Sequence, residues 1–163
     1  MNAHSLLTAV ASRPSLVPDR SKIGEDISYR DRADCERLLV ACYSLMDRGH
    51  YEASGELFSE DATWIRGEGP VHTRKGILAS LHRRPPQRQS RHFITNVVVT
   101  PLGDYAEATA YMIALHGVRT ADGPSPLPVP VAVCDLVVRF RRGEEWEITY
   151  LEPIQVFVPP SAG

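Results

Sequence analysis

The hydrophobic pattern of the chain changes its period once, and this change restricts the fold more than any other feature. Between residues 28 and 48, apolar side chains recur at steps of three and four, as on one face of a helix; they are Cys35, Leu38, Leu39, Cys42, Leu45 and Met46. Asp31 and Asp34 near the start and Gly49 just past the end fit the polarity and termination of a helix. The later part of the chain alternates instead, as half-buried strands do.

The remaining segments extend this outline. Shorter helices are expected over residues 51–58 and 74–83, with a short strand over 62–65 between them. Longer strands are expected over residues 92–100, 106–119, 131–141 and 145–158, joined in two places by glycine-containing hairpin turns. Helices followed by strands predict an α+β fold, with about three N-terminal helices packed on one face of a curved antiparallel sheet.

Composition excludes several classes of protein. The 163 residues are 43% hydrophobic and 23% charged, with a net charge of −2, as expected for a globular domain and not for a disordered or fibrous chain. No apolar run approaches the roughly 20 residues of a membrane helix. With a net charge close to zero, the chain has no overall positive potential that would attract nucleic acid. We therefore expect neither a membrane nor a nucleic-acid partner.

The N-terminal segment and the cysteines add two expectations. Residues 1–26 show no sustained periodicity, so we expect a flexible arm there and a single domain over residues 27–163. Cys35, Cys42 and Cys134 form an odd set beside apolar residues, which favours buried, reduced thiols. Without a convincing signal peptide, this predicts a cytoplasmic protein.

Three separated stretches of the chain carry a family resemblance. They are Asp31-Arg32-Ala33 through Met46-Asp47-Arg48-Gly49 to Glu60-Asp61-Ala62, then Arg91-His92-Phe93-Ile94-Thr95-Asn96-Val97, then residues 143–151 with Trp146. In this order they resemble the SnoaL-like family of the nuclear transport factor 2-like superfamily, over about residues 28–155. The resemblance implies a cone-shaped α+β barrel, in which a curved antiparallel sheet wraps around the helices and leaves a pocket at its open end.

Asp47 and His92 are the candidate catalytic residues. Their positions resemble the Asp–His dyad of scytalone dehydratase, bile-acid 7α-dehydratase and hexachlorocyclohexane dehydrochlorinase. The resemblance implies that His92 takes a proton and that Asp47 orients the ring. Proton abstraction from carbon needs a base with a pKa near neutral, and a carboxylate on the other ring nitrogen fixes the tautomer. The alternative is a helix-end carboxylate and a structural histidine.

Two strand residues are candidates for binding substrate. Asn96 shares a face with His92 if the strand alternates regularly, so its amide can bind a substrate oxygen; the alternative is a structural amide near a bulge. His116 shares a face with Met112 and Ala114 and lies near the position of a second pocket histidine in the family.

Four further residues complete the predicted substrate site. Trp64 and Tyr111 lie on strands where the family lines its pocket with aromatic side chains. Tyr43 lies one position after the place of a helix tyrosine in related enzymes, and Cys42 occupies that place itself. For each aromatic residue, the alternative to a direct role in the chemistry is a place in the core or the pocket wall, which we favour. Because cysteine stands at position 42, where related enzymes carry tyrosine, the sequence argues against a tyrosine acting as a general acid there.

The segment His82-Arg83-Arg84 with Arg88 and Arg91 is a local basic cluster. It either steers an anionic substrate or a carrier-bound acyl group, or it is a solvated loop. No spacing of His, Cys, Asp or Glu predicts a metal site, and there is no glycine-rich phosphate loop. We therefore expect neither a metal nor a cofactor.

These observations predict a cofactor-free enzyme of the lyase or isomerase type. It would act as a dehydratase, isomerase or cyclase on a mostly apolar, ring-containing or polyketide-like small molecule. The alternative is a non-catalytic binding protein or an accessory subunit similar to the small subunit of ring-hydroxylating dioxygenases. The apolar segment over residues 153–160 predicts a homo-oligomer, a dimer or a trimer.

Overall fold

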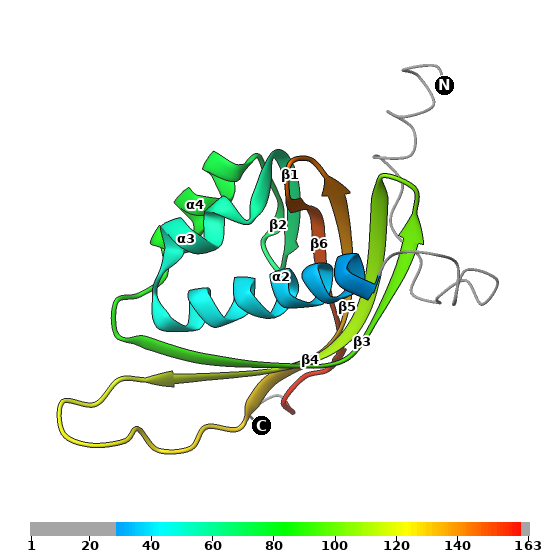
Figure 1. The fold of residues 1–163 in the computed structure, drawn as a ribbon. Coiled ribbons are helices and arrows are strands. Elements are labelled where there is room, and N and C mark those ends of the chain that lie inside the picture. The colour runs from blue at the N-terminus through cyan, green and yellow to red at the C-terminus, as the bar shows by residue number, and fades with distance from the viewer. Residues whose placement is uncertain (1–28, 161–163) are drawn as a thin grey trace.

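The computed structural model describes residues 29–160, which form three helices and one six-stranded sheet (Figure 1). The helices are α2 (Tyr29–Arg48), α3 (Tyr51–Glu56) and α4 (Arg74–His82). Two strands lie between α3 and α4, namely β1 (Phe58–Arg66) and β2 (Gly69–His72). Four long strands follow, namely β3 (Arg88–Leu102), β4 (Tyr105–Val118), β5 (Pro130–Arg142) and β6 (Trp146–Phe157). The flexible arm predicted over residues 1–26 lies outside the described residues.

The predicted α+β class is confirmed, with two differences in the sheet. Its order is β2-β1-β6-β5-β4-β3, and β1 pairs with β6 in parallel, so the sheet is mixed and not antiparallel throughout. It is also open, with β2 and β3 at its edges, and β2 is a strand that the sequence did not indicate. Alternation of apolar residues marks a strand but says nothing about the direction or identity of its neighbours, so neither feature was predictable from the pattern.

The sheet curves around α2, which crosses its inner face, while α3 and α4 cover the end formed by β1 and β2 (Figure 1). Bulges produce much of this curvature, because an extra residue on one strand bends it. One lies in β3 between Thr95 and Val98, and another lies between β4 and β5 next to Ala114 and Leu115. The core between helix and sheet contains fully buried side chains from both, among them Leu39, Met46, Phe58, Leu136 and Phe140.

Both ends of α2 are fixed. At its N-terminal end, the indole Nε1–H of Trp146 donates to Oδ1 of Asp31 at 3.0 Å. At its C-terminal end, Gly49 adopts φ +80°, and its N–H donates to the carbonyl of Met46 at 3.2 Å. Glycine terminates a helix this way because it adopts a left-handed conformation without a Cβ penalty. Asp47 is thereby held in the last turn, beside β3.

Candidate active site

Asp47 and His92 meet between the last turn of α2 and the inner face of β3. Nδ1 of His92 lies 2.6 Å from Oδ1 of Asp47, and the backbone N–H of His92 donates to Oδ2 at 2.7 Å. Ser90, two residues earlier on the same face of β3, donates its hydroxyl to Oδ1 at 2.9 Å. Both side chains of the pair are only 6% exposed. Three donors therefore converge on one carboxylate and fix its orientation and that of the imidazole.

The location of Asp47 is unfavourable for a carboxylate in two respects. It is buried, and it lies at the C-terminal end of a helix, where the helix dipole favours cations. Burial raises its pKa, but the hydrogen bonds from His92 and Ser90 outweigh burial, and its pKa lies below the ordinary range. The carboxylate is therefore ionised at neutral pH, and it can stabilise a positive charge on His92.

Two further rings surround His92. Tyr43 lies one helical turn before Asp47 on the same face of α2, and its ring centroid is 4.9 Å from that of His92. His116 on β4 pairs with Ser90 in the sheet register, which places it diagonally across from His92 at 6.0 Å between ring centroids. Arg88 donates from Nη2 to Nδ1 of His116. Burial and then the Arg88 guanidinium lower the pKa of His116 to about 4, so this ring is neutral at pH 7.

These rings line a cavity of about 460 Å³, a size suited to a small organic ligand. Its apolar wall comes from β4, β5 and their neighbours, and consists of Met112, Ala114, Val131, Ala132, Cys134 and Pro153. Trp64 on β1 also lines the cavity. The hydroxyl of Tyr43 and the indole Nε1 of Trp64 are buried and have no hydrogen-bond partner among residues 29–160. Such orphaned polar atoms are rare in buried positions, and here both belong to side chains of the cavity wall.

Three arginines also line the cavity: Arg66, Arg84 and Arg88. They come from the end of β1, the segment after α4 and the start of β3. From the sequence, Arg84 and Arg88 were predicted only as part of a local basic cluster, and Arg66 was not predicted as a site residue. The signal for Arg66 was its position two residues after Trp64 in a strand, which puts both on one face.

A larger depression of about 830 Å³ lies at the other end of α2, beside the turn between β5 and β6. Most of its charged residues pair with one another. Arg142 pairs with Asp31, and Arg30 and Arg37 lie 3.8 Å from Asp34. Its lining residues include no histidine or cysteine. The smaller cavity at His92 is therefore the better candidate for chemistry.

The family model for the SnoaL-like domain matches residues 28–152. The chain belongs to the SnoaL-like family, within the nuclear transport factor 2-like superfamily. None of the curated proteins has a sequence significantly similar to this chain.

Solved structures share the fold of this SnoaL-like chain. An NTF2-like protein with a cystatin-like fold from Novosphingobium aromaticivorans is 26% identical, with a TM-score of 0.65 over 78% of this chain and 82% of the other. ActVI-ORFA from Streptomyces coelicolor is 20% identical, with a TM-score of 0.65 over 76% and 96%. A type 2 hexachlorocyclohexane dehydrochlorinase is 18% identical, with a TM-score of 0.68 over 82% and 90%. The last two show a common fold alone.

Five of the predicted site residues of this SnoaL-like protein come together, namely Asp47, His92, Tyr43, Trp64 and His116. The other three lie elsewhere. Cys42 is fully buried next to Ser54 of α3, with 3.7 Å between Sγ and Oγ, because it projects from a different face of α2 than Tyr43. Tyr111 is 53% exposed on the outer face of the sheet, since inward-facing positions on β4 are Met112, Ala114 and His116.

Asn96 is exposed and does not line the cavity either. It adopts φ +55° within the bulge of β3, where the alternation that would align it with His92 is broken. Its amide oxygen accepts a hydrogen bond from the neighbouring Thr95 hydroxyl at 3.0 Å. The structure therefore favours the structural role that was the alternative for this residue.

All three cysteines are buried and unbridged, as predicted. Burial raises the pKa of Cys42 to about 12, which leaves it a thiol and not a nucleophilic thiolate at neutral pH. Within residues 29–160, no group of three His, Cys, Asp or Glu side chains is placed to hold a metal ion. Over the same residues, no helix has the length and apolar character that crossing a membrane requires.

Proposed function

We propose that this SnoaL-like protein is a cofactor-free enzyme that removes a proton from carbon next to a carbonyl group, with His92 as general base. The observation that carries the proposal is the 2.6 Å contact between Nδ1 of His92 and Oδ1 of Asp47 at the wall of a cavity. In this arrangement Nδ1–H donates to the carboxylate, and Nε2 keeps the lone pair that accepts the substrate proton. Asp47 is the positioning residue, and it stabilises the imidazolium that forms.

Tyr43 and Trp64 are suited to stabilise the enolate that proton removal creates. Both carry a buried polar atom without a partner among the described residues. Burial raises the pKa of Tyr43 well above its ordinary value, so the phenol stays protonated and can donate. Hydrogen bonds to a developing oxyanion in a dry site contribute more to catalysis than the same bonds in water. Cys42 and Asn96 have no part in this mechanism.

The fate of the proton distinguishes the reactions that the site can perform. In a dehydration, the imidazolium returns the proton to the departing hydroxyl oxygen as the carbon–carbon double bond forms. In an isomerisation, it returns the proton to a different carbon. The apolar wall of Met112, Ala114 and Cys134 favours a ring-containing substrate body in both cases. The dehydrochlorinase among the structural neighbours is named for an elimination, which is a reaction of this general type.

A screen in deuterated water tests the proposal. A panel of cyclic β-hydroxyketones is incubated with the protein, and NMR follows deuterium uptake at the α-carbon and the loss of water. For a substrate found this way, His92→Gln should lower turnover by roughly 10² to 10⁴, the usual contribution of a positioned base.

The matched control is His50→Gln. His50 is exposed, and its side chain makes no capping hydrogen bond at the start of α3. This variant should retain the wild-type rate. Equal turnover in the wild type and in His92→Gln would refute the base assignment.

The second candidate function is a non-catalytic binding protein or an accessory subunit. The outer face of the sheet favours it, because Phe93 and Tyr111 are 55% and 53% exposed there and are available to a partner. A protein of this kind would bind ligand in the cavity with equal affinity in wild type and His92→Gln, and neither would turn it over.

A further inference from the structure

The cavity beside His92 has an unbalanced charge. Arg66, Arg84 and Arg88 line it, and no aspartate or glutamate is among its lining residues. Asp47 lies behind His92 and is already occupied by three donors. The described part of the wall therefore presents three guanidinium groups and an apolar surface to a ligand.

The three arginines differ from several other arginines of the domain. Arg74, Arg139 and Arg141 each pair with a carboxylate within 4.0 Å. Among residues 29–160, no acidic side chain forms such an ion pair with Arg66, Arg84 or Arg88.

The contacts that they do make are uncharged. Arg66 lies 4.6 Å above the Trp64 ring and donates to Ser80, and Arg88 donates to His116. Nε of Arg84 is buried with no partner among the described residues. Each of the three thus has positive charge that no ion pair with an acidic side chain neutralises.

These cations also repel one another. Burial and then the Arg84 charge lower the pKa of both Arg66 and Arg88. Glu68 offsets part of this effect at Arg66, but it does not line the cavity. Arginine stays protonated at neutral pH, so the repulsion persists until an anion enters. A half-buried cluster of like charges is unfavourable on its own and therefore favours binding of a ligand of opposite charge.

We infer that the substrate of the His92 site is an organic acid, with an apolar ring against Met112 and Ala114 and a carboxylate bound by Arg66, Arg84 and Arg88. This inference rests on the proposed function for its catalytic part, but the binding of the anion does not depend on turnover. Guanidinium groups hold carboxylates through two parallel N–H···O bonds, which also orients the bound molecule. Arg88 contacts His116, the neighbour of His92, so the anchored acid lies within the same cavity as the base.

Calorimetric titration with a matched pair of probes tests the inference. The acid 2-naphthoate and the amide 2-naphthamide have the same shape and differ in charge. The wild type should bind the acid roughly 10- to 100-fold more tightly, which is the usual range for hydrogen bonds to a charged group. Because the site is partly open to ions, high salt should weaken binding of the acid and leave that of the amide unchanged.

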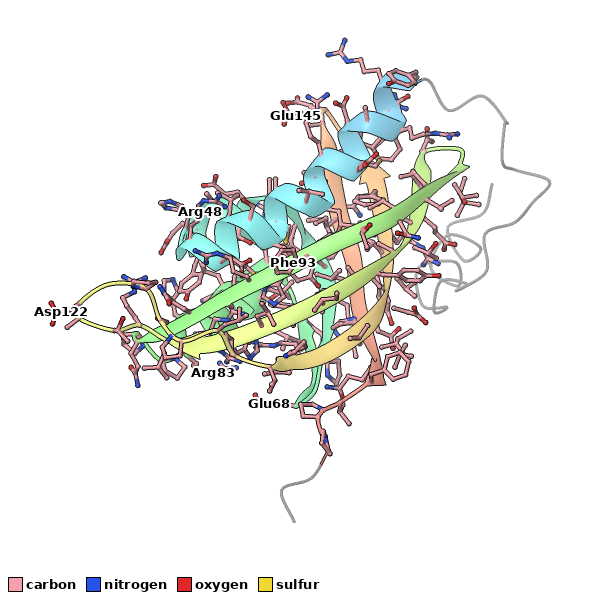
Figure 2. All side chains as sticks on the ribbon, turned by 90° about the horizontal axis from the view of Figure 1, so that it is seen from below. Arg48, Glu68, Arg83, Phe93, Asp122 and Glu145 are labelled. Carbon is pink, nitrogen blue, oxygen red and sulfur yellow. The ribbon has the colours of Figure 1, made fainter. Side chains whose placement is uncertain are left out.

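Substitutions of the arginines test which of them bind the carboxylate. Arg84→Gln, and the double variant Arg66→Gln/Arg84→Gln, should lose most of the preference for the acid, while Arg84→Lys retains part of it. The control is Arg48→Gln, because Arg48 at the end of α2 (Figure 2) is exposed, donates to Ser44 and does not line the cavity. Thermal melts verify that each variant folds.

Three results would overturn the inference: equal affinity of the wild type for acid and amide, an unchanged preference in the folded double variant, or binding of 2-naphthyl phosphate without binding of 2-naphthoate. His92→Gln separates the two proposals. If it keeps the preference for the acid and turnover does not depend on His92, the anion site stands and the proposed function fails. If the protein shows no preference for the acid but turnover requires His92, the proposed function stands and the anion site fails.

Discussion

At the scale of single residues, the site is an arrangement of hydrogen bonds around one carboxylate. Asp47 accepts from Nδ1 and the backbone N–H of His92 and from Ser90, and these bonds keep it ionised although it is buried at a helix C-terminus. Because the pKa of Asp47 lies below the ordinary range, the fold favours its ionised form. That charge contacts His92 at the cavity, as the proposed role of Asp47 in proton transfer requires.

Removing Asp47 should affect the same step as removing His92. In Asp47→Asn, the side-chain NH2 can donate to Nδ1 of His92. This favours the tautomer protonated at Nε2, which cannot accept a proton from the substrate, so turnover should fall by about 10² or more. Because the two side chains act as one unit, the double variant should be little worse than His92→Gln alone. The measurement is a double-mutant cycle on turnover, with circular dichroism as the folding control. Fully additive losses would contradict the dyad.

His116 should make the stability of the protein depend on pH. Its pKa is about 4 in the folded protein and returns to an ordinary value near 6.5 on unfolding, so between these values the unfolded chain binds a proton that the folded protein does not. The free energy of unfolding should therefore rise with pH across this window and fall on acidification.

The check is urea unfolding of wild type and His116→Gln at several pH values from 4 to 7. The variant should show a smaller loss of stability at low pH. In addition, Arg88→Gln should raise the pKa of His116 in an NMR titration, whereas Arg91→Gln should not. Parallel pH profiles for wild type and His116→Gln would show that burial does not perturb this histidine.

At the scale of elements, the bulge in β3 decides which side chains reach the cavity. Ser90 and His92 precede it and face inward, whereas Asn96 lies within it at φ +55° and is exposed. Asparagine tolerates this conformation better than most residues, and a β-branched residue tolerates it poorly. The requirement at position 96 is thus one of backbone conformation.

Substitutions at Asn96 should follow this requirement. Asn96→Gly should leave the stability within about 0.5 kcal/mol of wild type and leave turnover unchanged. Asn96→Val should cost about 1–2 kcal/mol, because its backbone would be forced into the left-handed region. Urea unfolding measures both. A large loss of turnover in a stable Asn96→Gly would restore the substrate-binding role predicted for the amide.

At the scale of the whole molecule, the outer face of the sheet is the feature that remains without a partner in a single chain. Phe93 on β3 (Figure 2) pairs with Ile113 on β4 in the sheet register, and both are exposed. Tyr111, also on β4, is exposed as well. Val156, Phe157 and Val158 near the end of β6 are exposed as well, within the apolar segment over residues 153–160. Contiguous apolar surface of this kind is typical of an interface.

We expect a homo-oligomer, a dimer or a trimer, that buries this face. Size-exclusion chromatography with light scattering should give a multiple of the 18.1 kDa chain mass at micromolar concentration. Phe93→Glu should shift the protein towards the monomer. Val40→Glu on the exposed side of α2 is the control, since Val40 is 44% exposed away from the sheet, and it should leave the mass unchanged. A wild-type monomer would contradict the expectation.

The sequence by itself determined the α+β class, the three helices, every strand except β2, and the family, because periodicity and local motifs are properties of neighbouring residues. It also placed Asp47 and His92 in the correct elements. Only the tertiary structure decided which side chains share the cavity. The bulge in β3 turns Asn96 away from the cavity, and Cys42 lies on a different face of α2 from Tyr43. The parallel pairing of β1 with β6 brings Trp64 and Arg66 into the cavity together with Arg84 and Arg88. These outcomes depend on register, curvature and strand pairing between segments far apart in the chain, which no local pattern encodes.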